Sequence, residues 1–243
     1  MDYSVLNSMS YADLKNMSSR MDLKPQRNKQ DYINNVMQAF KEYEEHKKDT
    51  IDKYTRVRQL GCTGKDGTTY LVKTKSGREY AMKTFKKQKS DDAIMKEIEL
   101  QKIASKNGIS PKIRDYDTVF KYIVMDKLDE NLYDILKSQK WTLTIDQQHQ
   151  LIKLFQTLDE IKILHNDPNP LNFMLKNGKM YIIDFGLSKK IDTALTDKLK
   201  SDSPNMKFMI VGFLLKIREI HPTSKFKELE KHVSKDDKKM FGF

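Results

Sequence analysis

The chain has 243 residues, of which 38% are hydrophobic and 33% are charged, and its formal net charge is +11 at pH 7. These values fit a soluble folded protein with a sizeable core. No apolar run approaches the roughly 20 residues of a membrane-spanning helix, and Met1–Lys15 lacks the basic and apolar segments of a secretory signal. The single cysteine, Cys62, excludes an internal disulfide and a cysteine-rich metal site, so we expect an intracellular location, cytoplasmic or nuclear.

The basic charge has two explanations of equal weight. A phosphate-bearing partner, such as a nucleotide or a nucleic acid, or an acidic protein would favour it. Lysine, asparagine, isoleucine and aspartate are all abundant, however, and an AT-rich genome would produce this bias without any ligand. The charge alone therefore assigns no function.

Residues 1–50 have a helical pattern. Tyr11–Arg20 is predicted to form a short helix, and Pro25 places a turn after it. Asn28 is predicted to cap a longer helix. The apolar side chains of that helix recur on one face, at Ile33, Val36, Met37 and Phe40.

From Lys53 onward the pattern changes. The residue pattern predicts strands at 54–60, 68–73 and 79–85, and two further strands or strand ends at 119–120 and 122–125. Helices are predicted at 91–104, 131–138, 145–163 and 204–220, with a hairpin at 173–183 and a loosely ordered tail after His221. This order is typical of an α+β fold in which a small sheet-rich lobe joins a helical lobe near 126–130, and a cleft between two such lobes is a natural nucleotide site.

Two motifs carry the most specific chemical signal. His165-Asn166-Asp167-Pro168-Asn169-Pro170-Leu171-Asn172 is followed by Asp184-Phe185-Gly186. Phosphoryl transfer needs oxygen ligands for magnesium and a carboxylate near the attacking hydroxyl. Asp167 can orient that hydroxyl and accept its proton, and Asn172 and Asp184 can bind the metal. Residue type, order and spacing all favour this interpretation over ordinary turn residues.

A glycine-rich segment and a strand lysine precede these motifs. Gly61, Gly64 and Gly67 could let backbone N–H groups approach phosphate oxygens, although their G-x-x-G-x-x-G spacing also fits an ordinary hairpin turn. Lys83, in Tyr80-Ala81-Met82-Lys83, matches the V-A-I-K pattern of a phosphate-binding lysine, and Ala81 leaves room for an adenine ring. A solvated strand lysine is the alternative for Lys83.

Glu97 is the predicted ion-pair partner of Lys83. It borders the buried face of its predicted helix, where its neighbours at i−3, i+1 and i+4 are Ile94, Ile98 and Gln101. Glu99 is the alternative, but lysines surround it and we expect it to be solvated.

Together these motifs, from about Tyr54 to Leu187, resemble the protein-kinase-like superfamily. The resemblance implies a bilobal fold that binds ATP and two magnesium ions and transfers the γ-phosphoryl group to a hydroxyl. By motif position it implies site roles for Lys83, Glu97, Asp167, Asn172 and Asp184, with Gly61, Gly64 and Gly67 over the phosphates. It also implies that Met125 is the gatekeeper and that Asp126 to Leu128 form the hinge beside adenine.

The chain departs from the family pattern in several places. Asn166 stands where many protein kinases have an arginine, so we expect no regulation by activation-loop phosphorylation that depends on this arginine. Asn169 stands where serine/threonine kinases usually have a lysine. Only 57 residues, 187–243, follow Gly186, and they contain no A-P-E motif, so a reduced helical lobe is expected. These features resemble compact atypical kinases of the RIO type, the kinase of the KEOPS complex and kinases of large DNA viruses. His165-Asn166-Asp167 also resembles choline and aminoglycoside kinases.

Residues 11–40 resemble a SAP motif, a DNA-binding helix pair, through Leu14, Leu23 and the segment Lys29–Ile33. The resemblance implies phosphate contacts from Arg20, Lys24, Arg27 and Lys29. A helical extension that packs on the kinase core explains the same pattern equally well.

We therefore expect a helical extension over 1–50 and a kinase-like domain over 51–243, with lobes 51–127 and 128–243. The leading hypothesis is ATP- and magnesium-dependent phosphorylation of serine or threonine hydroxyls in proteins. The alternatives are a pseudokinase tethered to DNA and a small-molecule kinase. The sequence indicates neither the physiological substrate nor the oligomeric state.

Overall fold

The computed structural model describes residues 2–242, without the side chains of 48–52. The chain divides into two compact units. The N-terminal unit contains the residues up to Thr55 together with Lys73–Gly77, and the main unit contains Arg56–Val72 and the residues from Arg78 onward. None of the helices described within 2–242 combines the length and apolar character that a membrane span requires.

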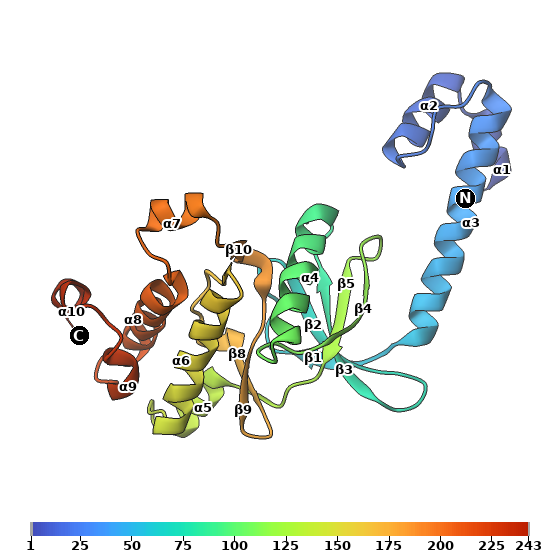
Figure 1. Ribbon diagram of the computed structural model, residues 1–243. Helices are drawn as coiled ribbons and strands as arrows, with labels where there is room; N and C mark the ends of the chain where they lie inside the picture. The colour runs from blue at the N-terminus through green and yellow to red at the C-terminus, as the bar shows by residue number, and fades with distance from the viewer. Residues whose placement is uncertain (1, 243) are drawn as a thin grey trace. The chain divides into compact units, whose positions relative to one another are not determined.

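The N-terminal unit is built from three capped helices, α1 (Tyr3–Ser8), α2 (Tyr11–Arg20) and α3 (Lys29–Lys53) (Figure 1). The predicted cap is present, since Oδ1 of Asn28 accepts from the N–H of Asp31. Helix α1 has no counterpart among the predicted elements. The helices bury a common cluster made of Leu6, Leu14, Tyr32, Ile33 and Val36.

The main unit begins with a five-stranded antiparallel sheet in the order β1-β2-β3-β5-β4. Its strands are β1 (Thr55–Leu60), β2 (Gly67–Lys73), β3 (Glu79–Phe85), β4 (Ile113–Asp117) and β5 (Tyr122–Asp126). The strand predicted at 119–120 is wrong, because the N–H of Phe120 donates to Oδ1 of Asp117 and Lys121 has φ 52°, which makes this segment a turn.

Helix α4 (Asp91–Lys106) packs on this sheet (Figure 1). Ser90 caps it by accepting from the N–H of Ala93. Its apolar side chains join residues of β3 and β5 in a buried cluster that contains Phe85, Ile94, Ile98, Ile123 and Met125. Because α4 and β3 share this cluster, side chains at their common border are held in fixed positions.

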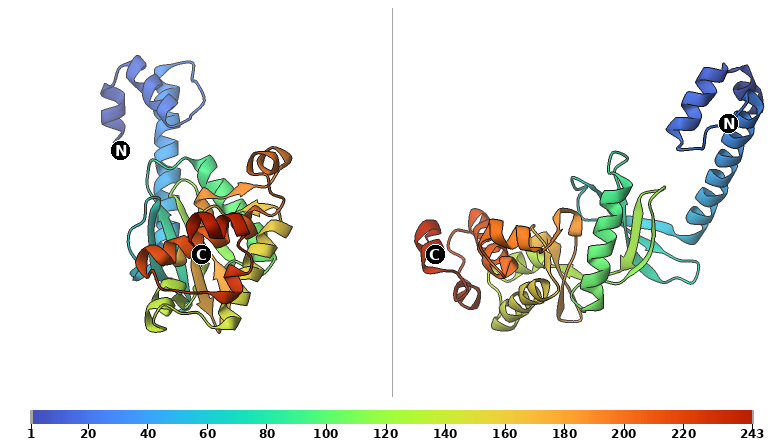
Figure 2. Two further views of the ribbon diagram at one scale, coloured as in Figure 1. Left: turned by 90° about the vertical axis from the view of Figure 1, so that its left-hand side faces the viewer. Right: turned by 45° about the horizontal axis from the view of Figure 1, so that its top comes forward.

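The rest of the main unit is mostly helical (Figure 2). Before His221, its α-helices are α5 (Leu132–Ser138), α6 (Ile145–Glu160), α7 (Thr193–Leu199) and α8 (Ile210–Ile220). Helix α6 ends before the predicted residue 163, since Lys162 adopts φ 58°. The short strands are β6 (Glu130–Asn131), β7 (Ile163–Leu164), β8 (Phe173–Lys176), β9 (Lys179–Ile182) and β10 (Lys189–Lys190).

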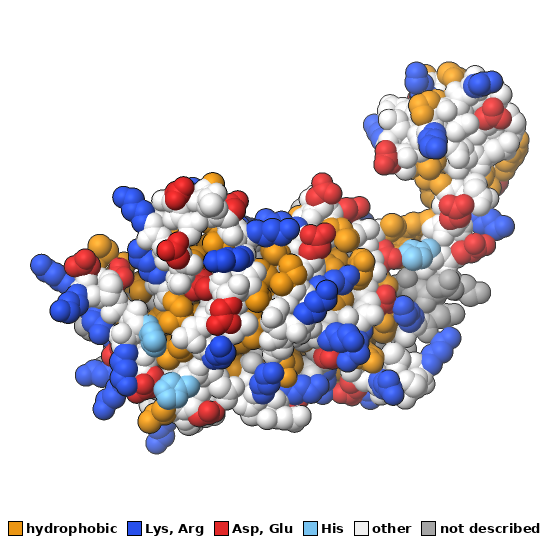
Figure 3. Space-filling view, in the orientation of Figure 1, with side chains coloured by type: hydrophobic (Ala, Val, Ile, Leu, Met, Phe, Trp, Pro, Cys, Tyr) orange, Lys and Arg blue, Asp and Glu red, His pale blue; other side chains and the backbone are white. Residues whose placement is uncertain are grey.

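The segment predicted as one helix at 204–220 consists of a π-helical turn, η3 (Asn205–Met209), followed by α8. The prediction of a loosely ordered tail after His221 is wrong. This segment contains the helices α9 (Lys227–Glu230) and α10 (Lys235–Phe241). Burial explains this difference, because Phe226, Leu229 and Val233 join the main core. Basic and acidic side chains are interspersed on the face shown in Figure 3, so the net charge of +11 is not gathered in one patch there.

Candidate active site

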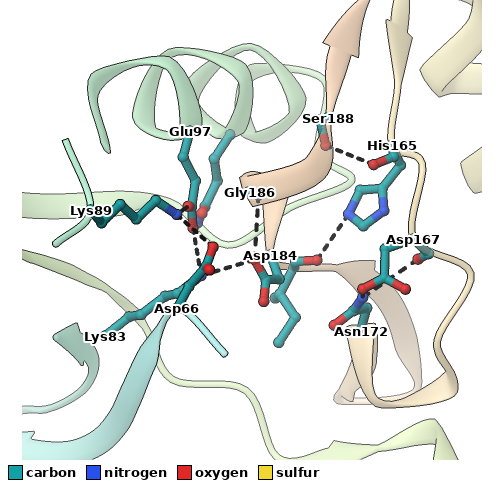
Figure 4. Close-up of polar contacts among 12 residues, drawn as sticks. Asp66, Lys83, Lys89, Glu97, His165, Asp167, Asn172, Asp184, Gly186 and Ser188 are labelled. Carbon is teal, nitrogen blue, oxygen red and sulfur yellow. Dashed lines mark hydrogen bonds and ion pairs between the residues drawn. The ribbon is translucent and has the colours of Figure 1, made fainter. Parts of the chain in front are cut away.

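Lys83 and Glu97 form a buried ion pair that also engages Asp184 (Figure 4). Lys83 extends from β3 and is 8% exposed, and Glu97 lies on α4 and is 1% exposed. Nζ of Lys83 lies 2.6 Å from Oε1 of Glu97 and 2.9 Å from Oδ1 of Asp184. The predicted partner of Lys83 is therefore in place, and Glu99, the alternative, is exposed.

The electrostatics of this group keep Lys83 and Asp184 charged. Burial would lower the pKa of Lys83, but the charges of Glu97 and Asp184 outweigh it and raise that pKa above its ordinary value. Burial would likewise raise the pKa of Asp184, but the Lys83 charge outweighs it and lowers that pKa. Lys83 is thus a cation and Asp184 an anion at neutral pH, as phosphate and metal binding require.

Asp167 and Asn172 contact each other across a tight turn. A 3-10 turn, η1 (Pro170–Asn172), lets Nδ2 of Asn172 donate to Oδ2 of Asp167 at 2.8 Å. The backbone N–H of Asn169 donates to Oδ1 of Asp167 at 3.2 Å. Both carboxylate oxygens are therefore oriented by the loop itself. Figure 4 shows Asp184 between Lys83 and this pair, so the predicted side chains lie in one site.

His165 braces the loop from within the core. It is fully buried, its Nε2–H donates to the carbonyl of Ile183 at 3.0 Å, and its ring lies 5.0 Å from that of Phe185. Burial lowers the pKa of His165, so the ring is neutral at neutral pH. Its backbone N–H donates to Oδ1 of Asn205, and its carbonyl accepts from the hydroxyl of Ser188, both at 3.0 Å.

Asn205 and Asp159 form a second polar group that the sequence motifs do not indicate. Oδ1 of Asp159 accepts from both the backbone N–H and Nδ2 of Asn205, at 2.9 and 2.7 Å. Nδ2 of Asn205 also donates to the carbonyl of Ile163 at 2.7 Å. Burial raises the pKa of Asp159 in spite of these hydrogen bonds. No spacing rule connects these residues, which are brought together by the packing of η3 on α6.

The three glycines of the predicted phosphate cover differ in their surroundings. Gly61 adopts φ +69°, and the N–H of Gly64 donates to the carbonyl of Gly67 at 2.8 Å. A Cβ at Gly67 would lie 2.0 Å from the carbonyl oxygen of Thr84 on β3. Gly67 is therefore required by the close approach of β2 to β3. A role over the phosphates remains a prediction for all three glycines.

Ala81 and Met125 face each other on neighbouring strands, in the register of β3 with β5. Met125 is 7% exposed, and its Sδ accepts from Nε2 of Gln101 on α4 at 3.5 Å. The side chain of Met125 is thus directed toward α4, which fits the gatekeeper position that the resemblance implies.

The side chain of Asp126 forms an ion pair with Arg114. Its two carboxylate oxygens accept from Nε and an Nη of Arg114, at 2.7 and 2.9 Å. Asp126 and Leu128 also line a cavity of about 500 Å³ whose other walls include Ser110, Lys112 and Tyr181. The carboxylate of Asp126 is therefore engaged, and any contact of this residue with adenine would use its backbone.

Comparison with known proteins decides the family. A sequence profile of the protein kinase domain matches residues 54–208, which is well over half of the chain and includes every residue predicted to take part in nucleotide binding, metal binding or catalysis. The chain belongs to the protein kinase family. A protein kinase domain implies the use of ATP and, as a rule, of magnesium.

Two relatives illustrate the family relation. A probable serine/threonine-protein kinase of Dictyostelium discoideum is 33% identical over 128 residues, which is 45% of this chain and 13% of that protein. The dual specificity protein kinase Ttk of Danio rerio is 28% identical over 96 residues, which is 37% of this chain and 10% of that protein. The match thus spans only a small part of the length of either relative.

The donor atoms of this kinase site suit magnesium. Each hydrogen bond and ion pair described for the carboxylate of Asp184 uses Oδ1, so Oδ2 is left for a cation. Nδ2 of Asn172 is used by Asp167, which leaves its amide oxygen. Magnesium prefers oxygen ligands and commonly binds one or two protein oxygens together with substrate phosphates. Asn172 and Asp184 would hold it in this way.

One further site residue, Lys89, is missing from the predictions. Its Nζ lies 2.7 Å from Oε2 of Glu97 and 2.8 Å from Oδ2 of Asp66. The chain contains 45 lysines and arginines, and Lys89 lies in a turn before α4 without any motif. No sequence signal could have distinguished it from the solvated lysines nearby.

Proposed function

We propose that this chain is an ATP- and magnesium-dependent kinase that phosphorylates serine or threonine hydroxyls of proteins. One arrangement carries the proposal: the Lys83–Glu97 pair, Asp184 and the Asp167–Asn172 pair lie in a single site (Figure 4). The two relatives, a probable serine/threonine kinase and a dual specificity kinase, support a protein hydroxyl as the acceptor.

In the proposed reaction, Lys83 neutralises phosphate charge. Asn172 and Asp184 would hold magnesium, which would shield the charge that develops on the phosphates. Asp167 orients the attacking hydroxyl and accepts its proton. The hydroxyl oxygen forms a bond to the γ-phosphorus as the bond from that phosphorus to the β–γ bridging oxygen breaks. ADP leaves with the electron pair of the broken bond.

This proposal is tested with the full chain, radiolabelled ATP, magnesium and a mixture of basic and acidic proteins. Asp167→Ala and Asp184→Ala should each reduce phosphoryl transfer by about 100-fold or more, because each removes a charged group of the site. Asp197→Ala, at an exposed position on α7, is the matched control and should retain full transfer.

Undiminished transfer in both site variants would overturn the proposal. Binding of magnesium and ATP without transfer to any protein would instead favour a nucleotide-binding pseudokinase. Phosphorylation of choline or an aminoglycoside, with none of protein, would favour the small-molecule kinase.

We also propose that the N-terminal unit contacts the phosphate backbone of DNA. The location that we propose for the protein is intracellular, in the cytoplasm or the nucleus. Helices α2 and α3 pack through Leu14 and Ile33, and the basic side chains Arg20, Lys24 and Arg27 are exposed between or beside them. Exposed basic groups on a helix pair are suited to phosphate contacts. Lys29 supports the proposal less, since its Nζ donates to the carbonyl of Asn7 at 2.8 Å.

Gel-shift titrations of the full chain with duplex DNA at several salt concentrations test this contact. Replacing Arg20, Lys24 and Arg27 together with alanine should weaken DNA binding. The slope of log binding constant against log salt concentration should become shallower by about 0.9 for each phosphate contact that is lost. Lys41→Ala, exposed on α3, serves as the control. Absence of any shift by the wild-type chain at low salt would exclude the contact.

A further inference from the structure

Glu97 is held by two lysines, one on each carboxylate oxygen. Oε1 receives Lys83, and Oε2 receives Lys89 at 2.7 Å. The side chain of Lys89 is only 11% exposed. The Nζ atoms of Lys83 and Lys89 lie 5.1 and 4.7 Å from the centre of the same Phe85 ring, which is within the range of a cation–π contact for each ammonium group. Figure 4 shows the two lysines converging on Glu97.

Lys89 also binds the loop that precedes β2. We call residues 61–67 the glycine-rich loop; Asp66 lies near its end, and its Oδ2 is 2.8 Å from Nζ of Lys89. The backbone carbonyl of Asp66 accepts from the N–H of Lys86 at 2.9 Å. A Cβ on Gly186 would lie 3.0 Å from the same Oδ2. The Asp66 carboxylate is therefore held next to the turn that follows Asp184.

The charges in this group alternate. Asp66, Lys89, Glu97, Lys83 and Asp184 form a chain of carboxylates and ammonium groups in which each neighbouring pair is in contact. Without Lys89, Oε2 of Glu97 would lose its partner in a buried place, and Asp66 would be an uncompensated anion beside Asp184. Both changes disfavour the approach of further negative charge, such as phosphate.

We infer that Lys89 is a positioning residue that holds Glu97 and the glycine-rich loop in the arrangement that receives the phosphates of ATP. Lys89 acts through two other side chains: it fixes Glu97, which in turn orients Lys83, and it ties Asp66, and hence the loop, to α4. The inference rests on the proposed function for the identity of the ligand, ATP with magnesium.

Isothermal titration calorimetry of the full chain with magnesium and ADP gives the first test. Lys89→Met should weaken ADP binding about tenfold, which corresponds to the loss of one charge-assisted contact. Lys87→Met, exposed in the same turn, is the matched control and should bind as the wild type does. Lys89→Arg, which keeps the charge, should bind more tightly than Lys89→Met does.

Hydrogen exchange separates positioning from a general loss of structure. Lys89→Met should speed exchange in the glycine-rich loop and in the first turns of α4, while β5 and α6 keep their protection. Asp66→Asn should speed exchange in the loop alone, because the Lys89–Glu97 contact remains. In kinetics, Lys89→Met should raise KM for ATP by a larger factor than it lowers kcat.

Equal ADP affinity and equal exchange in Lys89→Met and Lys87→Met would overturn the inference. Exchange that rises throughout the main unit would also overturn it, since Lys89 would then serve overall stability. If the wild-type chain binds ADP but transfers no phosphate, only the proposed function is rejected. The ADP-binding and hydrogen-exchange comparisons would still test the role of Lys89.

Discussion

At the scale of single residues, the amide of Asn205 is held by hydrogen bonds beneath the loop that carries Asp167 and Asn172. It accepts from the backbone of His165 and donates to Asp159 and to the carbonyl of Ile163. Asn205 is fully buried, and burial raises the pKa of Asp159. The amide of Asn205 is therefore a neutral hydrogen-bond donor that offsets the cost of burying the carboxylate of Asp159.

Replacing this donor with an acid should make stability depend strongly on pH. Asn205→Asp would place a carboxyl group about where Nδ2 lies 2.7 Å from Asp159, and two carboxylates that close cannot both ionise. The folded pKa of the pair would lie above the ordinary value of 3.8 given for Asp159. Sharing one proton between the two carboxyl groups contributes stability that is fully present below the ordinary pKa, which applies to the unfolded chain. This stability is lost as pH rises through the higher pKa of the folded pair.

We therefore expect Asn205→Asp to be about 3 kcal/mol less stable than wild type near pH 7 and closer to wild type near pH 4.5, as measured by urea unfolding. Asn205→Ala, the matched control, should lose about 2 kcal/mol with a smaller dependence on pH, because it adds no charge. A deficit in Asn205→Asp that is constant with pH, or that grows in acid, would contradict this account of the pair.

At the scale of elements, the pairing of β2 with β3 depends on one missing side chain. A Cβ at Gly67 would meet the carbonyl oxygen of Thr84 at 2.0 Å and the Cα of Phe85 at 3.0 Å, and backbone atoms cannot yield as a flexible side chain does. Gly64, three residues earlier, has its nearest neighbour, the carbonyl of Gly67, at an ordinary 3.5 Å. The two glycines thus offer a matched pair of sites in one loop.

Gly67→Ala should destabilise the main unit by about 3 kcal/mol, since overpacking against backbone moves β2 away from β3. Gly64→Ala should change the unfolding free energy by less than about 1 kcal/mol, since the added methyl group has room. Thermal and urea unfolding of the two variants measure the difference. Equal stability of both variants would show that β2 does not need this close approach.

At the scale of the whole molecule, the two units have separate buried clusters. The cluster of the N-terminal unit centres on Leu6, Leu14 and Tyr32, whereas the clusters of the main unit lie around α4 and α6. Each unit therefore gains its own apolar burial. A unit of about 60 residues with one such cluster has little stability to spare.

Leu14→Ala should unfold the N-terminal unit selectively. The side chain of Leu14 is fully buried, so the substitution should cost about 2–5 kcal/mol, which is comparable to the whole stability of a unit of that size. Hydrogen exchange of the full chain should show protection lost in α2 and kept in α6, with ADP affinity unchanged. Lys15→Ala, exposed on α2, is the control. Loss of protection in α6 would show that the two units unfold together.

The sequence by itself determined what depends on local order. The motifs of Asp167, Asn172 and Asp184 lie on tight turns, and the pattern of α4 put Glu97 on its buried side, so both could be predicted. Helix caps, alternating strands and the N-terminal helix pair are local in the same sense. The position of β4 and the end of α6 were missed because single turn residues decide them.

Only the tertiary structure decided which distant polar groups meet. Lys89 reaches Glu97 and Asp66, and Asn205 reaches Asp159 and His165, across segments that have no fixed spacing in the chain. The order of the tail after His221 likewise depends on burial of Phe226 and Leu229 in a core formed by earlier helices. Contacts of this kind follow from packing, which no local pattern encodes.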